Sequence, residues 1–109
     1  MSLRIEWTAS ALQSLLDVFE YTYGEFGELQ LRRLRRKIIK TTQSISAFPQ
    51  MGVIDPISDK LGIEYRSMMV IPEIKIIYCI MDDFIQIEYV KNSRLDDMTM
   101  LMNMRLPIK

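Results

Sequence analysis

Hydrophobic and polar residues alternate at the start of the chain. Leu3, Ile5 and Trp7 are apolar, whereas Arg4 and Glu6 between them are charged. A period of two in residues that favour β structure is typical of a short, half-buried strand. Trp7 is expected in the core, as most tryptophans are.

The pattern then changes to a helical period. Thr8 has a hydroxyl that can cap a helix N-terminus. Beyond it, apolar residues recur on one stripe of a helix predicted from about Ala9 to Tyr23, namely Leu12, Leu15, Leu16, Phe19 and Tyr23. Gly24 and Gly27 predict a short turn after this helix.

A second helix follows and ends near Pro49, because proline disfavours helical geometry in the residue before it. Its apolar residues share one face, namely Leu31, Leu34, Ile38, Ile45 and Phe48, with Thr41 between them. Two helices joined by a short turn that contains glycine predict an antiparallel helical hairpin. Residues 49–62, with two prolines and two glycines, are interpreted as a loop.

Three strands are predicted in the second half, over residues 63–70, 74–80 and 84–90, with turns at residues 72–73 and 82–83. In the second strand one face is predicted to carry Ile74, Ile76, Tyr78 and Ile80. In the third, Ile85, Ile87 and Tyr89 are predicted to share a face. Helices followed by hairpin-linked strands predict an α+β domain, in which antiparallel strands form one sheet packed on the helices.

The composition limits the chemistry. The 109 residues suit a single domain, predicted to span 1–109. The chain has no histidine, which excludes imidazole catalysis, and its single cysteine, Cys79, excludes an internal disulfide and fits the cytoplasm. We therefore expect no metal and no cofactor. No secretory signal is expected, because the N-terminus lacks a basic stretch followed by an apolar core, and no membrane span is expected, because no apolar run approaches about 20 residues.

Charge is unevenly distributed although the net charge is zero. One basic and five acidic groups in residues 1–28 give −4, whereas residues 29–45 carry six basic groups and no acidic one: Arg32, Arg33, Arg35, Arg36, Lys37 and Lys40. This run has the charge needed to bind nucleic acid or an acidic partner. The interpretation we favour is a solvated helix face, paired with acidic residues of the first helix such as Asp17, Glu20 and Glu25.

Several short motifs, in a constant order over about residues 3–97, resemble the RelE/ParE toxin family of type II toxin–antitoxin systems, also called plasmid stabilisation proteins. The matching stretches are Ile5-Glu6-Trp7-Thr8 with Ala11 and Leu12; Ile45, Phe48-Pro49 and Gly52; Gly62 with Tyr65-Arg66; Ile76-Ile77-Tyr78 and Asp82-Asp83; and Ile87, Val90, Arg94 and Asp96. The resemblance implies the RelE/ParE fold, growth inhibition by a toxin, and neutralisation by a cognate antitoxin.

Departures from the family pattern bear on mechanism. The family often has arginine at the place of Lys75 and histidine at the place of Asn92. RelE-like ribonucleases carry a tyrosine or histidine near the C-terminus, and this chain has neither after Tyr89. The resemblance therefore favours a ParE-like inhibitor of DNA gyrase that acts by binding and is not an enzyme. The alternatives are a RelE-like, metal-independent endoribonuclease acting on mRNA or the ribosome, and an inactive homologue that still binds its antitoxin.

Candidate site residues follow from both arguments. Arg66, Lys75 and Arg94 are the catalytic candidates of a ribonuclease, since cations stabilise the developing phosphorane charge. Arg66 is expected on the concave face of the sheet, where it would hold a phosphate or carboxylate; the alternative is an ion pair with an acid such as Glu88. Without histidine, the acid and base would come from a lysine or from Glu64, Tyr78, Glu88 or Tyr89.

The last residues, 98–109, form a methionine-rich tail. Every second position is apolar: Met98, Met100, Met102, Met104, Leu106 and Ile108. This alternation and Pro107 predict an extended segment whose methionines contact another surface at a free sheet edge, in this chain or in another. Arg66, Arg94 and these four methionines are thus the partner-binding candidates, and a homodimer is possible. Met68, Met69 and Met81 are interpreted as core filler.

Overall fold

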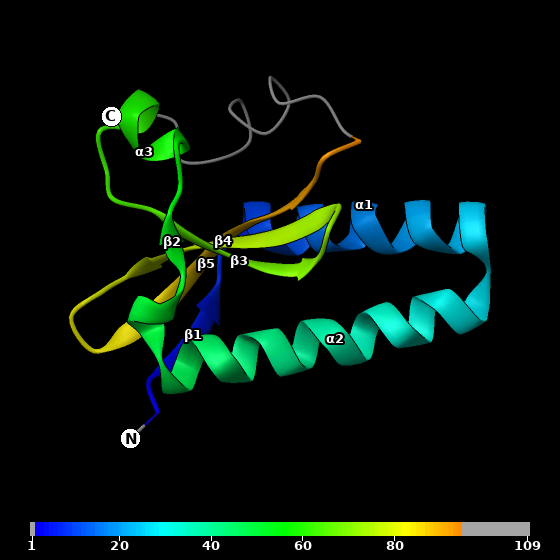
Figure 1. Cartoon of the computed structure of the whole chain (residues 1–109), viewed down its shortest axis with the longest axis horizontal. Coiled ribbons are helices and arrows are strands. Elements are labelled where there is room, and N and C mark those ends of the chain that lie inside the picture. The colour runs from blue at the N-terminus through cyan, green and yellow to red at the C-terminus, as the bar shows by residue number, and fades with distance from the viewer. Residues whose placement is uncertain (1, 95–109) are drawn as a thin grey trace.

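The computed structural model describes residues 2–94, and all the long predicted elements are present in it (Figure 1). The chain begins with strand β1 (Arg4–Trp7), helix α1 (Ala9–Phe26) and helix α2 (Glu28–Ala47). It ends with strands β3 (Arg66–Ile71), β4 (Ile74–Ile80) and β5 (Phe84–Asn92). The predicted α+β class, with a helical hairpin before a sheet, is confirmed.

The hairpin turn is shorter than predicted. Thr8 caps α1 as expected, since its Oγ1 accepts a hydrogen bond of 3.0 Å from the backbone N–H of Ala11. However, α1 continues through Gly24, so a turn beginning at that glycine was wrong. The break lies at Gly27, whose φ of 86° suits glycine and whose N–H donates to the carbonyl of Tyr23 at 2.9 Å.

The sheet is mixed rather than wholly antiparallel, and its strand order is β1-β5-β4-β3-β2. Strands β2 to β5 pair antiparallel, but β1 lies parallel to β5, with Ile5 opposite Ile85. The antiparallel pairing expected for the three C-terminal strands is confirmed, whereas the parallel pairing of β1 with β5 was not predicted. The hairpin of α1 and α2 carries the chain between the two halves of the sheet, and this long crossover is what allows a parallel pair.

The predicted loop at residues 49–62 contains three short elements. They are the 3-10 helix η1 (Pro49–Met51), the two-residue strand β2 (Val53–Ile54) and helix α3 (Ile57–Leu61). The carboxylate of Asp55 accepts from the N–H of Ile57 at 3.0 Å and starts α3, and Gly62 ends it with a φ of 71°. Residues 63–65 were predicted as strand, but β3 begins only at Arg66. Elements this short depend on tertiary contacts.

The helices cover one face of the sheet, and this face holds the main core. Ile74, Ile76 and Tyr78 of β4 are buried there and Ile80 is half-buried, so the predicted face of β4 is confirmed. Met68 and Trp7 pack against the same core, as expected. Met69 and Met81 are exposed, so their interpretation as core filler was wrong.

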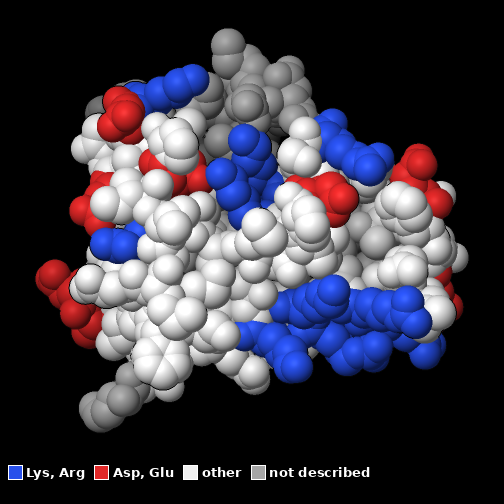
Figure 2. Space-filling model, in the orientation of Figure 1, with Lys and Arg blue, Asp and Glu red and all other residues white. Residues whose placement is uncertain are grey.

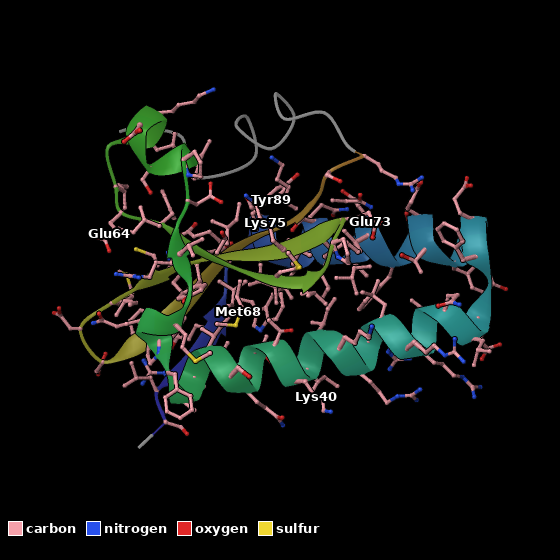
Figure 3. All side chains as sticks on the ribbon, in the orientation of Figure 1. Lys40, Glu64, Met68, Glu73, Lys75 and Tyr89 are labelled. Carbon is pink, nitrogen blue, oxygen red and sulfur yellow. The ribbon has the colours of Figure 1, made fainter. Side chains whose placement is uncertain are left out.

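Strand β5 changes face at a β-bulge. Ile77 pairs with Tyr89 but the next residue, Tyr78, pairs with Ile87, so Glu88 has no opposite residue. Ile87 therefore faces the helices, while Tyr89 packs with Tyr65 and Ile77 on the opposite face. The single face predicted for Ile85, Ile87 and Tyr89 was wrong for this reason. Figure 3 shows Met68 on the side of α2 and both Lys75 and Tyr89 on the other side.

Helix α1 packs mainly through small residues, and of its apolar stripe only Leu15 and Phe19 pack against the core. Its buried residues are Ala11, Ser14, Val18 and Thr22. Leu12, Leu16 and Tyr23 of the stripe remain 50%, 54% and 58% exposed. Small side chains let the helix approach β5 closely, and at the bulge the Oγ of Ser14 accepts from the N–H of Val90 at 2.9 Å.

Candidate functional site

Arg66 binds the backbone of the turn that precedes β2. Its Nη1 donates to the carbonyl of Gly52 at 2.8 Å and to that of Gln50 at 3.3 Å, and Nη2 lies 3.2 Å from Glu64. The side chain is 18% exposed. Arg66 pairs across the strands with Tyr78, so it lies on the helix-covered face and not on the open one. The ion pair forms with Glu64, not with Glu88.

Tyr78 forms hydrogen bonds with the backbone of the same turn. Its hydroxyl donates to the carbonyl of Pro49 at 2.6 Å and accepts from the N–H of Gly52 at 3.1 Å. A Cβ at Gly52 would lie 2.2 Å from that hydroxyl oxygen, so only glycine fits. Burial raises the pKa of Tyr78, although the N–H of Gly52 and the charge of Arg66 oppose the shift. This phenol is therefore a structural group that stays protonated at neutral pH.

Lys75 lies on the open face of the sheet and forms an ion pair with Asp55, at 2.6 Å between Nζ and Oδ2. The carboxylate of Asp55 is 4% exposed and the ammonium group's side chain 34%. Burial alone raises the pKa of Asp55, but Lys75, the N–H of Ile57 and Ser67 together lower it below its ordinary value. The pair joins β4 to the start of α3. Sequence reasoning missed Asp55, although an aspartate before Pro56 is a recognisable turn and capping signal.

Arg94 follows β5, at the end of the sheet beside the helical hairpin. Its Nη1 donates to the hydroxyl of Tyr21 at 3.3 Å, and Tyr21 in turn packs edge-on against Phe26, with ring centroids 6.4 Å apart. The structure therefore does not bring the three predicted cations together. Arg66 and Lys75 are on opposite faces of the sheet, and Arg94 lies by α1.

The acid and base candidates are not poised for proton transfer either. Tyr78 and Tyr89 are buried, and so is Glu88, which is 2% exposed and accepts from Gln86. Only Glu64 among the four is exposed, and it lies at one end of the sheet while Glu73 lies at the other (Figure 3).

The basic residues of α2 form one continuous band on the surface. In Figure 2 it runs along the lower right, where Figure 1 shows α2, and Lys40 points away from the sheet in Figure 3. Among the described residues, the one ion pair of these six cations joins Arg32 to Glu28 within α2, at 2.7 Å. The predicted pairing with Asp17, Glu20 and Glu25 of α1 was wrong. Most of the positive charge of this band is therefore exposed and unneutralised by the described acidic residues.

A pocket of about 400 Å³ opens between the end of α1, the first half of α2 and the turn that joins β3 to β4. Tyr21, Phe26, Leu34, Ile71 and Ile74 give it apolar walls, and Arg33, Lys37, Glu73 and Arg94 are the charged residues that line it. Sequence reasoning named Arg94 and the basic run but not the pocket. Its walls come from elements far apart in the chain.

Residues 2–94 were also considered as a membrane anchor and as a metal site on the features that either would need. Neither a helix able to cross a membrane nor a group of acidic and cysteine residues able to hold a metal ion occurs in this part of the chain. Met98, Met100, Met102 and Met104 lie outside the described residues, so their expected role stays a prediction.

Comparison with known proteins gives the family. Residues 5–94 match the model of the ParE toxin of the type II toxin–antitoxin system, parDE. A search of curated proteins found no match. Because the family model spans most of the chain, the protein belongs to the ParE toxin family of type II toxin–antitoxin systems.

Solved structures share the fold. A chain of the chromosomal ParDE toxin–antitoxin system from P. aeruginosa is 15% identical, with a TM-score of 0.67 over 84% of this chain and 96% of that one. The YoeB dimer from Staphylococcus aureus is 19% identical, with a TM-score of 0.55 over 84% and 97%. The YoeB–YefM complex from Staphylococcus aureus is 21% identical, with a TM-score of 0.53 and the same two shares.

Proposed function

We propose that this toxin acts in the cytoplasm by binding a macromolecular target, DNA gyrase, and that a cognate antitoxin neutralises it, as in plasmid stabilisation systems. The observation that carries the proposal is the separation of Arg66, Lys75 and Arg94. A ribonuclease must gather cations around one phosphate. Here Arg66 holds backbone carbonyls, Lys75 holds Asp55, and the two lie on opposite faces of the sheet.

Proton transfer adds support. RNA cleavage needs one group to take the proton of the 2′-hydroxyl and another to protonate the leaving oxygen, both within reach of the same phosphate. Tyr78 is buried with its hydroxyl bound to the turn, and Tyr89 and Glu88 are also buried. Glu64 remains, and its nearest cation is the partly buried Arg66. A toxin of this construction is better suited to binding than to cleavage.

The surface of the hairpin supports a protein partner. Leu12, Leu16 and Tyr23 leave half or more of their side chains exposed on α1, next in sequence to the basic band of α2. An exposed apolar helix face and a basic helix face in one hairpin are suited to a protein interface, in which aromatic residues and arginine are enriched.

Controlled expression of the full chain in bacteria tests the proposal. We expect growth arrest, loss of negative supercoiling in a reporter plasmid, and intact mRNA, with the same loss when purified toxin is added to purified gyrase. Specific mRNA cleavage by folded protein, abolished by Arg66→Ala with an unchanged circular dichroism spectrum, would establish the RelE-like alternative. Normal growth at high soluble expression would indicate an inactive homologue that retains only antitoxin binding.

A further inference from the structure

The pocket beside the turn of the helical hairpin combines two properties that usually occur apart. Its walls are apolar, from Tyr21 and Phe26 of α1, Leu34 of α2, and Ile71 and Ile74 of the sheet. Its volume of about 400 Å³ is within the range of sites that enclose a ligand or a few side chains. The edge-on packing of Tyr21 and Phe26, with Arg94 bound to the tyrosine hydroxyl, fixes one wall.

The charged residues of the pocket are mostly basic. Arg33, Lys37 and Arg94 face one acidic residue, Glu73. Arg33 and Lys37 are four residues apart on α2, where like charges destabilise a helix. Neither forms an ion pair with another described residue. An anionic partner would relieve this repulsion, so the arrangement is suited to a bound state.

We propose that this pocket is the docking site for an acidic segment of a partner protein, which inserts a bulky apolar side chain between Tyr21, Phe26 and Ile71 while its carboxylates face Arg33, Lys37 and Arg94. The proposal rests on the proposed function, in which a protein antitoxin binds this toxin. It adds the place of binding and the chemistry of the bound segment. The apolar anchor gives affinity, and the carboxylates select the partner and steer its approach.

Nucleic acid fits the pocket less well. Phosphate contacts would leave the apolar walls formed by Leu34, Ile71 and Ile74 in water, and the chain has no net positive charge for general binding to a polyanion. A peptide with apolar and acidic side chains would contact both the apolar walls and the basic residues of the pocket. An amphipathic helix with apolar anchors at i and i+4 and glutamates beside them is the simplest ligand of this kind.

Two double variants of the full-length chain separate the pocket from the rest of the basic band. Arg33→Glu with Lys37→Glu reverses two charges that line the pocket. Arg36→Glu with Lys40→Glu makes the same change at the same spacing on the same helix, at residues outside the pocket. Gln30→Trp, at an exposed residue of the lining, fills the space without changing charge.

Fluorescence polarisation with synthetic peptides measures binding. The probe is a labelled peptide of about 12 residues with leucine and phenylalanine at i and i+4 and glutamates on the same face. We expect Arg33→Glu/Lys37→Glu and Gln30→Trp to weaken binding at least about tenfold, and Arg36→Glu/Lys40→Glu by less than about threefold. A peptide with lysine in place of glutamate should bind the Arg33→Glu/Lys37→Glu protein instead.

Other results overturn the proposal. Equal losses in the two double variants would mean diffuse attraction to the band, and tighter binding of a single-stranded oligonucleotide would assign the surface to nucleic acid. If the acidic peptide does not bind but a peptide of residues 95–109 does, the pocket belongs to the chain's own tail. Peptide binding does not depend on toxicity, so a chain that leaves growth unaffected but shows the expected losses refutes the proposed function and not this site.

Discussion

The two faces of the sheet are stabilised by different means. The face under α1 and α2 is a continuous apolar core, with Ile76, Ile85 and Ile87 of the strands beneath Val18 and Ile45 of the helices. The open face has a small cluster around Tyr65, Ile77 and Tyr89, covered in part by the five residues of α3. There the ion pair of Asp55 and Lys75 joins α3 to the sheet. A long helix can be held by packing alone, whereas a helix of one turn needs polar contacts at its start.

The two helices also differ from each other. Helix α2 follows its sequence pattern, burying Leu34, Ile38 and Ile45 and exposing its cations. Helix α1 fully buries only small residues and exposes Leu12, Leu16 and Tyr23, because its contact with β5 is close. The exposed part of the apolar stripe of α1 is thus left for solvent or for a partner.

The largest expected effect comes from breaking the apolar core under the helices. Ile45→Ala removes a fully buried side chain and should lower the free energy of unfolding by about 2–5 kcal/mol, since it leaves a cavity. Ile39→Ala on the same helix, at a side chain that is 56% exposed, should cost less than about 1 kcal/mol. Urea unfolding followed by circular dichroism measures both, and similar losses would contradict the burial.

Enlarging the close contact of α1 should have the next largest effect. Ser14→Leu overpacks the interface with β5 and removes the acceptor for the N–H of Val90, which together should cost about 2–4 kcal/mol. Glu20→Leu makes a similar side chain on the exposed side of α1 and should change stability by no more than about 0.5 kcal/mol. A stable Ser14→Leu protein would contradict the close approach of α1 to β5 at Ser14.

The open face should respond to pH where the helix-covered face does not. The pKa of Asp55 is lowered in the folded state, so its contribution is fully present above the unfolded value of about 3.9 and is lost as the pH falls through the folded value. At neutral pH, Asp55→Asn should cost about 1–2 kcal/mol, and the gap to the wild type should close in acid. Asp59→Asn on α3 is the control, at an exposed carboxylate, and a gap unaffected by pH would exclude the ion pair as its cause.

The smallest effect on stability is expected on the exposed stripe of α1. Leu16→Gln replaces a side chain that is 54% exposed and should change the free energy of unfolding by about 0.5 kcal/mol or less. If the stripe binds a partner, the same variant should weaken growth inhibition or its relief by the antitoxin, scored on plates at equal soluble expression. Full activity of Leu16→Gln and Tyr23→Ser together would leave the stripe without a role in binding.

The sequence by itself determined the long elements and their class. Periods of two and of 3.6 located β1, β4, β5 and both helices, and the ordered motifs identified the toxin family, because these signals are carried by neighbouring residues. The sequence also located the basic run of α2, but it did not predict that these cations form no ion pairs with the acidic residues of α1.

Tertiary structure alone decided the rest. The bulge at Glu88 moved Tyr89 to the open face, and the close packing of α1 left Leu12 and Leu16 exposed. The pairing of β3 with β4 placed Arg66 on the helix side, where it holds a turn instead of a phosphate. The pocket is lined by residues as far apart in the sequence as Tyr21 and Arg94. Local patterns record the preferences of single segments, whereas the face of a strand, the partner of a charge and the walls of a pocket depend on which distant segments pack together.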